Sequence, residues 1–174
     1  MTTYLITGAN RGIGLALTAL ALGGFGIGIG EFAIMGLLPE VANGLSITPP
    51  EAGHAISAYA LGVVIGAPVL TIFFARVPQK AMLIGLMVAF TLGNIASAFA
   101  PNPWLLVLFR FLSGLPHGAY FGIASLVAAA LVPVNKQAGA IGRMMLGVSL
   151  SNVIGVPLIT WLGHFRFILF VFKC

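Results

Sequence analysis

Five long apolar runs follow one another along the chain. The runs that contain no Asp, Glu, Lys or Arg are 12–30, 52–75, 81–109, 111–135 and 144–165. Each approaches or exceeds the ~20 apolar residues that cross a bilayer as an α-helix. They do not alternate apolar with polar positions, as the strands of a membrane β-barrel do. The pattern therefore predicts a series of membrane-spanning helices.

Turn-forming residues mark where the predicted helices end. Pro39 closes the first, and its connection to the second contains Asn43-Gly44 and Pro49-Pro50. Pro101 ends the third helix and Pro133 ends the fourth. We predict an all-α fold, a polytopic membrane helix bundle with about five transmembrane helices, formed by residues 16–163. The predicted spans are 15–38, 52–75, 81–100, 104–132 and 138–162.

Glycines recur at four-residue spacing inside these spans. Gly62 and Gly66 form such a pair in the second span, and Gly114 and Gly118 form another in the fourth. Small residues spaced in this way share one helix face and let two backbones approach closely in lipid. The spacing predicts that the spans pack together as a bundle, whatever the function of that bundle.

Composition supports a membrane protein over a soluble one with buried helices. The chain is 60% hydrophobic and 6% charged, whereas soluble domains have roughly 25% charged residues. Its eight Lys and Arg form no cluster, so a nucleic-acid partner is disfavoured. The single cysteine, Cys174, allows no internal disulfide or Cys-based metal site. We expect a lipid bilayer as partner, no cofactor, no metal and no enzymatic activity.

The basic residues fall on alternate sides of the predicted membrane. The first connection carries only the acidic residues Glu40 and Glu51, and the third connection carries no charge. The positive-inside rule then places the N-terminus and the second and fourth connections in the cytoplasm. We predict a multi-pass protein of the bacterial inner-membrane type. The residues that set this orientation are Arg11, Arg76, Lys80, Lys136 and Arg143.

Residues 1–15 differ in pattern from the spans and are predicted to form an N-terminal extension. Residues 4–7 have the composition of a strand, and a glycine-rich turn with Gly8, Gly12 and Gly14 follows. This segment resembles the N-terminus of short-chain dehydrogenases, whose turn lies under the cofactor pyrophosphate. The sequence contains no Tyr-x-x-x-Lys pair and no second strand pattern around the acidic residue, Glu31. An NAD(P)-dependent oxidoreductase is therefore only a remote alternative.

Glu31 and Arg110 are the candidate chemical groups, because ionisable residues cost roughly 2.5–3.5 kcal/mol at the middle of a membrane helix. Glu31 lies eight residues before Pro39, and Arg110 lies seven residues after Pro103. At ~1.5 Å per residue, both lie about 10–12 Å below the same membrane surface. They are predicted to meet or to face one cavity. Desolvation favours a neutral carboxyl and a guanidinium favours a charged one, so the pair could load and release a proton.

Structural roles remain open for the same residues. Glu31 and Arg110 could form an ion pair that joins two helices, or could snorkel to the interface. His117 follows Pro116 inside the fourth span. It could bind a proton or a ligand, or could serve only helix packing beside a proline kink. Arg143 is near enough to the start of the fifth span to snorkel to the cytoplasm.

From about residue 16 to residue 163, the sequence resembles the N-terminal half of a major facilitator superfamily transporter, of the arabinose-efflux-like drug:proton antiporter type. The resemblance implies proton-coupled efflux of a sugar or a drug-like small molecule. It also implies that the first and fourth helices line a central cavity. The residues that carry it are Gly30-Glu31-Phe32, 35–39, 56–62, 66–68, Arg110-Phe111, Gly114, His117-Gly118, Gly147, Ser151-Asn152, Gly155-Val156-Pro157 and Gly163.

The resemblance assigns roles to three groups of residues. It implies a transport or proton pathway at Glu31, Arg110 and His117. It implies a cytoplasmic gate at the second connection, where Arg76 and Lys80 are present but Ala75 stands in place of the usual acid. The last group is the antiporter-type motif of the fifth helix, Gly147, Asn152, Gly155 and Pro157.

The family has twelve spans in two halves, whereas this chain is predicted to stop inside the sixth. We interpret residues 164–174 as a divergent, truncated tail. The alternative to a transporter is then an inactive membrane fragment of one. If the chain is active, it is expected to associate with itself to supply both halves.

Overall fold

The computed structural model describes residues 2–164, with side chains for residues 11–162, and every regular element in that range is helical. Five helical segments of the described chain are long and apolar enough to cross a membrane, which confirms the predicted number of spans. The helices are α1 (Thr2–Gly36), α2 (Leu38–Leu45), α3 (Pro49–Phe73), α4 (Gln79–Ala98), α5 (Pro103–Ala130), η1 (Val134–Lys136), α6 (Gln137–Leu150), the π-helical η2 (Ser151–Gly155) and α7 (Val156–His164). Residues 165–174, the predicted tail, lie outside the described range.

The local prediction for the N-terminal segment is wrong. Helix α1 runs without a break from Thr2 to Gly36, so residues 4–7 form no strand and Gly8, Gly12 and Gly14 form no turn. A lone strand leaves its backbone groups unpaired, whereas a helix satisfies them within its own segment. A continuous helix also lacks the exposed amides of the phosphate-binding turn that the motif predicts.

The first connection is also more regular than predicted. Residues 38–45 form the short helix α2, and Asn43-Gly44 lies inside it. Pro39 is in the first turn of α2, where the missing N–H would have no helical partner. The helix ends at Ser46, whose φ of 55° is left-handed. The proline that stops α1 therefore starts a second helix.

Helix α3 begins with a capping box. The Thr48 hydroxyl accepts a hydrogen bond from the Glu51 amide, and the Thr48 amide donates to Glu51 Oε2 at 2.8 Å. This arrangement satisfies two amides that the start of a helix leaves unpaired. The Glu51 carboxylate thus has a local structural role at the end of the bundle.

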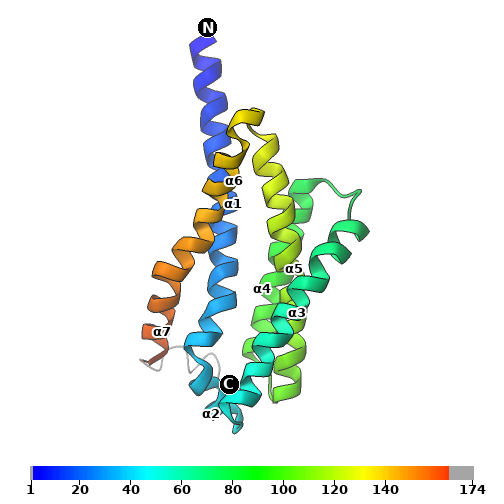
Figure 1. The fold of residues 1–174 in the computed structure, drawn as a ribbon, viewed down its shortest axis with the longest axis vertical. Helices are drawn as coiled ribbons and strands as arrows, with labels where there is room; N and C mark the ends of the chain where they lie inside the picture. Colours follow the sequence, from blue (N-terminus) through cyan, green and yellow to red (C-terminus); the bar gives the residue numbers. More distant parts are fainter. Residues whose placement is uncertain (1, 165–174) are drawn as a thin grey trace.

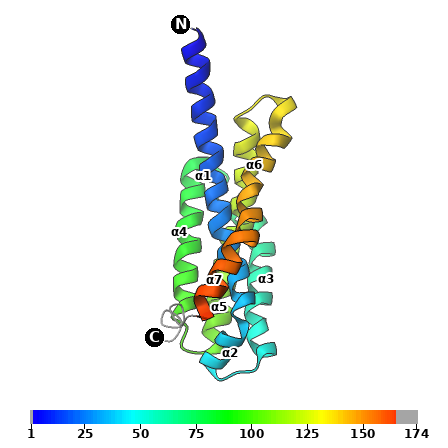
Figure 2. The same cartoon turned by 90° about the vertical axis from the view of Figure 1, so that its left-hand side faces the viewer.

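The helices form two groups. Helices α3, α4 and α5 pack together, with the most extensive contact between α3 and α5, and α1 packs along α6. In Figures 1 and 2, the N-terminal end of α1 projects at one end of the bundle, and α2 lies at the other. The α3–α4 and α5–α6 connections lie toward the N-terminal end of α1 (Figure 1), so the basic residues of these connections lie toward one end.

Close backbone contact between α3 and α5 confirms the prediction from glycine spacing. A Cβ atom added to Gly66 would lie 2.6 Å from the Leu115 carbonyl carbon. One added to Gly118 would lie 2.9 Å from the Ala67 Cβ. Real Cβ atoms almost never approach other atoms so closely, so these positions require glycine unless the helices move apart.

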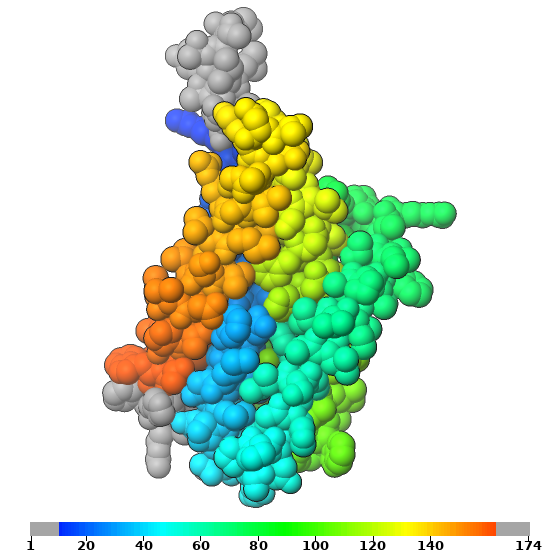
Figure 3. Space-filling view, viewed as in Figure 1, coloured from blue at the N-terminus to red at the C-terminus, as the bar shows by residue number. Residues whose placement is uncertain are grey.

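The outer surface of the bundle is apolar. Figure 3 shows one face, on which α6, α7, part of α1 and α3 lie at the surface. Exposed apolar side chains on each long helix are the composition expected for a lipid-facing surface. Examples, each more than 50% exposed, are Leu22, Val64, Leu92, Leu126 and Val153.

Candidate functional site

Arg110 is the buried charge around which the site is built. It lies on α5 and is 3% exposed. Its Nη1 donates to the Gly30 carbonyl of α1 at 2.9 Å and to Asn94 Oδ1 of α4 at 3.2 Å. The site is closely packed here, since a Cβ at Gly30 would lie 2.6 Å from Phe90 Cζ and 3.4 Å from Asn94 Oδ1. One guanidinium therefore joins three helices.

Tyr59 of α3 adds a fourth helix to the site. The Arg110 Cζ lies 4.2 Å from the centre of the Tyr59 ring, a cation–π geometry. The Tyr59 hydroxyl lies 2.8 Å from Nδ1 of His117, in hydrogen-bonding range. Tyr59 is 2% exposed, so it bridges Arg110 and His117 inside the bundle.

Glu31 lies in the same cluster but does not pair directly with Arg110. Its Oε2 is 3.8 Å from Nδ1 of His117, within salt-bridge distance when the histidine is protonated. The Arg110 guanidinium lies within range of a through-space electrostatic interaction with the carboxyl group. The sequence argument thus placed Glu31 and Arg110 in one region, whereas the structure gives His117 as the nearest ionic partner of Glu31.

His117 is in contact with groups on three helices. Besides Glu31 and Tyr59, its ring packs against Phe121 with ring centres 5.1 Å apart. The same Nδ1 faces both the Tyr59 hydroxyl and the carboxyl group of Glu31. When Nδ1 carries a proton it donates, and when it is bare it accepts from the tyrosine hydroxyl. The arrangement can therefore hold a proton at either Glu31 or His117.

We call Glu31, Tyr59, Asn94, Arg110 and His117 the polar cluster. The Arg110 Nε is buried and makes no hydrogen bond to the described residues. Because a guanidinium has five N–H donors, Arg110 retains the capacity to bind another acceptor. The cluster thus combines a fixed positive charge, two sites for a proton and a spare donor.

The sequence reasoning missed Asn94 and did not single out Tyr59 as a site residue. Asn94 lies seven residues before Pro101, which is about 10 Å along a helix and matches the predicted depth of Glu31. The depth comparison applied to Glu31 and Arg110 would have found it. Tyr59 has no such signal, because an aromatic side chain is common in an apolar span.

The proposed gate residues are separate from the polar cluster. Arg76 and Lys80 are exposed at the α3–α4 connection. Neither makes an ion pair or a side-chain hydrogen bond within the described part of the chain. Their position at the end of the bundle is compatible with contacts to a group outside this chain.

The antiporter-type residues lie where α6 and α7 pack on α1. A Cβ on Gly147 would lie 2.7 Å from the Ala21 carbonyl carbon, and one on Gly155 would lie 2.8 Å from Ile29 Cγ1. Asn152 is in the π-helical segment and donates to the Val148 carbonyl at 3.2 Å. Pro157 follows in α7 and has no N–H for an α-helical bond. The fifth span is therefore irregular and closely packed.

Replacing Tyr59 by phenylalanine is expected to destabilise the bundle by about 0.6–1.7 kcal/mol, the range for a side-chain hydrogen bond between membrane helices. The ring over Arg110 remains, and only the contact with His117 is lost. Unfolding of the purified chain in detergent measures this effect. Tyr120→Phe is the comparison variant: it also loses a hydrogen bond between helices, from its buried hydroxyl to the Leu20 carbonyl at 2.9 Å, and should be destabilised to a similar extent. Equal stability of Tyr59→Phe and the parent chain would contradict the contact.

Comparison with known proteins adds independent information. Residues 20–172 match the family described as Major Facilitator Superfamily. The chain is 51% identical over 152 residues to an Escherichia coli inner membrane transport protein, YdhP, and the aligned region is 87% of this chain and 39% of YdhP. A chloramphenicol resistance protein of Streptomyces lividans is 34% identical, with 86% and 39% covered. A probable sugar efflux transporter of Helicobacter pylori is 33% identical, with 74% and 33% covered. The chain thus spans about two fifths or less of the length of these relatives.

Proposed function

Because the chain belongs to the Major Facilitator Superfamily, we propose that it forms one helix bundle of a transporter that exchanges protons for an outgoing small molecule. The observation that carries the proposal is the polar cluster inside an otherwise apolar bundle. Ionisable groups within membrane helices are costly and mark ion or substrate pathways.

Glu31 is the proposed proton carrier. Its carboxylate takes up a proton from water on one side of the membrane and releases it to water on the other side. With neutral His117, the cluster has no net charge when Glu31 is ionised and a net charge of +1, from Arg110, when Glu31 is protonated. This change in charge is what could couple proton binding to release of the transported molecule, through groups such as the spare donor of Arg110.

The names of the relatives suggest the class of substrate. One is a chloramphenicol resistance protein and another a probable sugar efflux transporter. We propose a sugar or a drug-like molecule with hydrogen-bonding groups, carried outward across a bacterial inner membrane. Arg76 and Lys80 are proposed to belong to the cytoplasmic gate. Closely packed Gly147 and Gly155 are proposed to limit proton leakage along the fifth span, together with Asn152 and Pro157.

Transport is expected to need a second bundle. The described residues form one bundle, and alternating access requires two that move about a central site. The second bundle would come from another copy of this chain or from another polypeptide segment. A membrane fragment without activity is the competing proposal.

The test is proton flux in liposomes that contain the purified chain and an enclosed pH-sensitive dye. Chloramphenicol and a panel of sugars are added in turn across an imposed pH gradient. Proton movement that depends on one of these compounds supports the proposal. Flux no greater than in empty liposomes, from chain shown to be inserted, supports the inactive fragment.

The proposed orientation gives a separate prediction. In a Cys174→Ser background, a cysteine at Asn43 in α2 is expected to react with an impermeant maleimide from outside the inner membrane. A cysteine at Gln79, at the start of α4, is expected to react only after permeabilisation. Both positions are exposed, and α3 lies between them. The reverse labelling pattern would show that the N-terminus is not cytoplasmic.

A further inference from the structure

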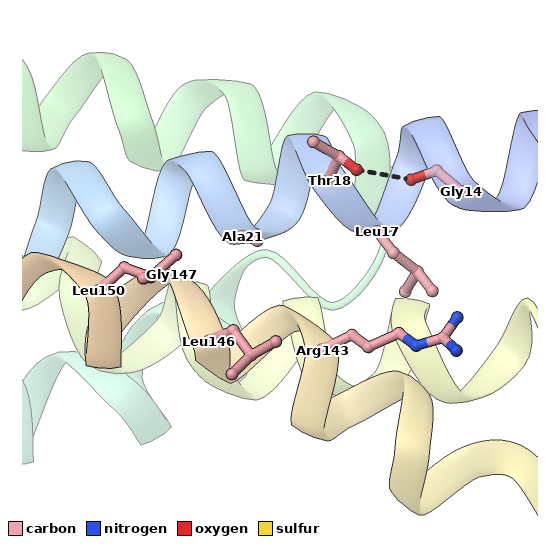
Figure 4. Close-up of a pocket in the computed structure, with 8 residues that line it drawn as sticks. All are labelled: Gly14, Leu17, Thr18, Ala21, Arg143, Leu146, Gly147 and Leu150. Atoms are coloured by element: carbon pink, nitrogen blue, oxygen red, sulfur yellow. Dashed lines mark hydrogen bonds between the residues drawn. The ribbon is translucent and has the colours of Figure 1, made fainter.

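A groove separate from the polar cluster runs between α1 and α6. Its volume is ≈ 330 Å³, at the lower end of the roughly 300–1,000 Å³ of small-molecule sites. Figure 4 shows that residues of the two helices line it. Gly147 lets α6 approach the backbone of Ala21, whereas a Cβ on Gly14 would have no neighbour within 4 Å. Helices α1 and α6 therefore touch at the level of Gly147 and leave open space at the level of Gly14.

The walls of the groove are apolar. Leu17 is buried at 4% exposure, and Leu146 and Leu150 are about half exposed. Thr18 could add a polar group, but its hydroxyl donates to the Gly14 carbonyl at 2.9 Å within α1. In a helix that spans a membrane, an apolar slot with exposed leucines on one wall is suited to a hydrocarbon chain.

A single cation, Arg143, lies at this groove. Its guanidinium points toward the N-terminal part of α1 (Figure 4). It makes no ion pair or hydrogen bond with the described residues. The chain has only three acidic side chains, of which Glu31 is in the polar cluster and Glu40 and Glu51 belong to the α1–α3 region at the other end. No carboxylate of the described residues therefore neutralises Arg143.

We propose that this groove binds an anionic phospholipid, with one acyl chain along Leu17, Leu146 and Leu150 and the phosphate on Arg143. A guanidinium binds phosphate oxygens through two parallel hydrogen bonds. The headgroup of phosphatidylglycerol leaves that phosphate free, whereas the cation of a zwitterionic headgroup competes with Arg143 for it. The proposal combines an apolar slot with an unpaired cation, and it does not depend on transport.

The test measures the lipid retained by the purified, detergent-solubilised chain by native mass spectrometry. Phosphatidylglycerol, phosphatidylcholine and inorganic phosphate are the probes. We expect the chain to retain at least about fivefold more phosphatidylglycerol than phosphatidylcholine. Retention of phosphatidylglycerol should fall about fivefold in Arg143→Gln, because one basic residue near an anionic membrane surface contributes about that factor to binding. Arg143→Lys should restore most of the retention. Arg76→Gln is the control, because Arg76 is exposed outside the groove and lies toward the same end.

A second pair of variants tests the acyl slot. Gly14→Leu is expected to fill the groove and reduce retention of phosphatidylglycerol, and Gly85→Leu is expected to leave it unchanged, since a Cβ at either glycine has open space. Equal losses in Arg143→Gln and Arg76→Gln would overturn the site. Displacement of the lipid by inorganic phosphate alone would show that the groove is only a phosphate site. Cross-links between two chains across α6 that exclude lipid would show that the groove binds a second copy of the chain. Either of these results would overturn the proposal.

Discussion

Glu31→Gln is expected to abolish proton-coupled transport without unfolding the bundle. Glutamine has the shape of glutamic acid and can keep a polar contact with His117, but it cannot bind and release a proton in the physiological range. The side chain is 26% exposed and joins α1 to the polar cluster. Substrate-dependent proton flux should fall to the level of empty liposomes, whereas detergent unfolding should change little.

Glu51→Gln is the matched control for this experiment. Glu51 is one of the three acidic side chains, it lies at the exposed start of α3, and glutamine can also complete a capping box. Flux through Glu51→Gln should equal that of the parent chain. Continued proton coupling in Glu31→Gln would show that another group, such as His117, carries the proton.

Gly66→Leu is expected to destabilise the native bundle strongly. Extra methylene groups in a packed core cost roughly 1–3 kcal/mol, and here the added atoms meet the rigid backbone of Leu115 rather than a side chain that can move. The α3–α5 contact, the most extensive in the bundle, would have to open. We therefore expect a loss at or above that range, large against the roughly 5–15 kcal/mol that stabilises a folded domain.

The fraction of chain that elutes as a monodisperse species in detergent measures this loss, together with its unfolding midpoint. Gly53→Leu is the control on the same helix, because a Cβ at Gly53 has no neighbour within 4 Å. Both variants add the same side chain and the same helix propensity. A folded Gly66→Leu with an unchanged midpoint would mean that α3 and α5 are farther apart than the structure shows.

The spans could be predicted because lipid imposes one requirement, about twenty apolar residues for each helix. Predictions from short sequence motifs were less reliable where the same residues are compatible with two different local structures. Pro39 marks the end of one helix and equally the first turn of the next, so α2 was expected to be a turn. The glycines at residues 8–14 fit a phosphate-binding turn, yet they are compatible with a helix that continues into a long apolar span.

The sequence predicted that Glu31 and Arg110 lie at a similar level of the bundle, but it did not predict which side chains each one contacts. Distance along a helix gives the level of Glu31 and Arg110, and both are in one cluster. Which side chains touch depends on the rotation of each helix about its own axis. This rotation cannot be derived from the sequence spacing of residues on different helices. The bond from Arg110 to the Gly30 carbonyl and the contact between Glu31 and His117 therefore required coordinates.

The hydrogen bond from Arg110 to the Gly30 carbonyl affects how α1 and α5 are held together. It attaches α5 to the backbone of α1 next to Glu31 rather than to the carboxyl group itself. A backbone carbonyl does not titrate, so this acceptor is present whether the neighbouring acid is charged or neutral. Helices α1 and α5 can therefore stay joined at this level while Glu31 gains or loses a proton.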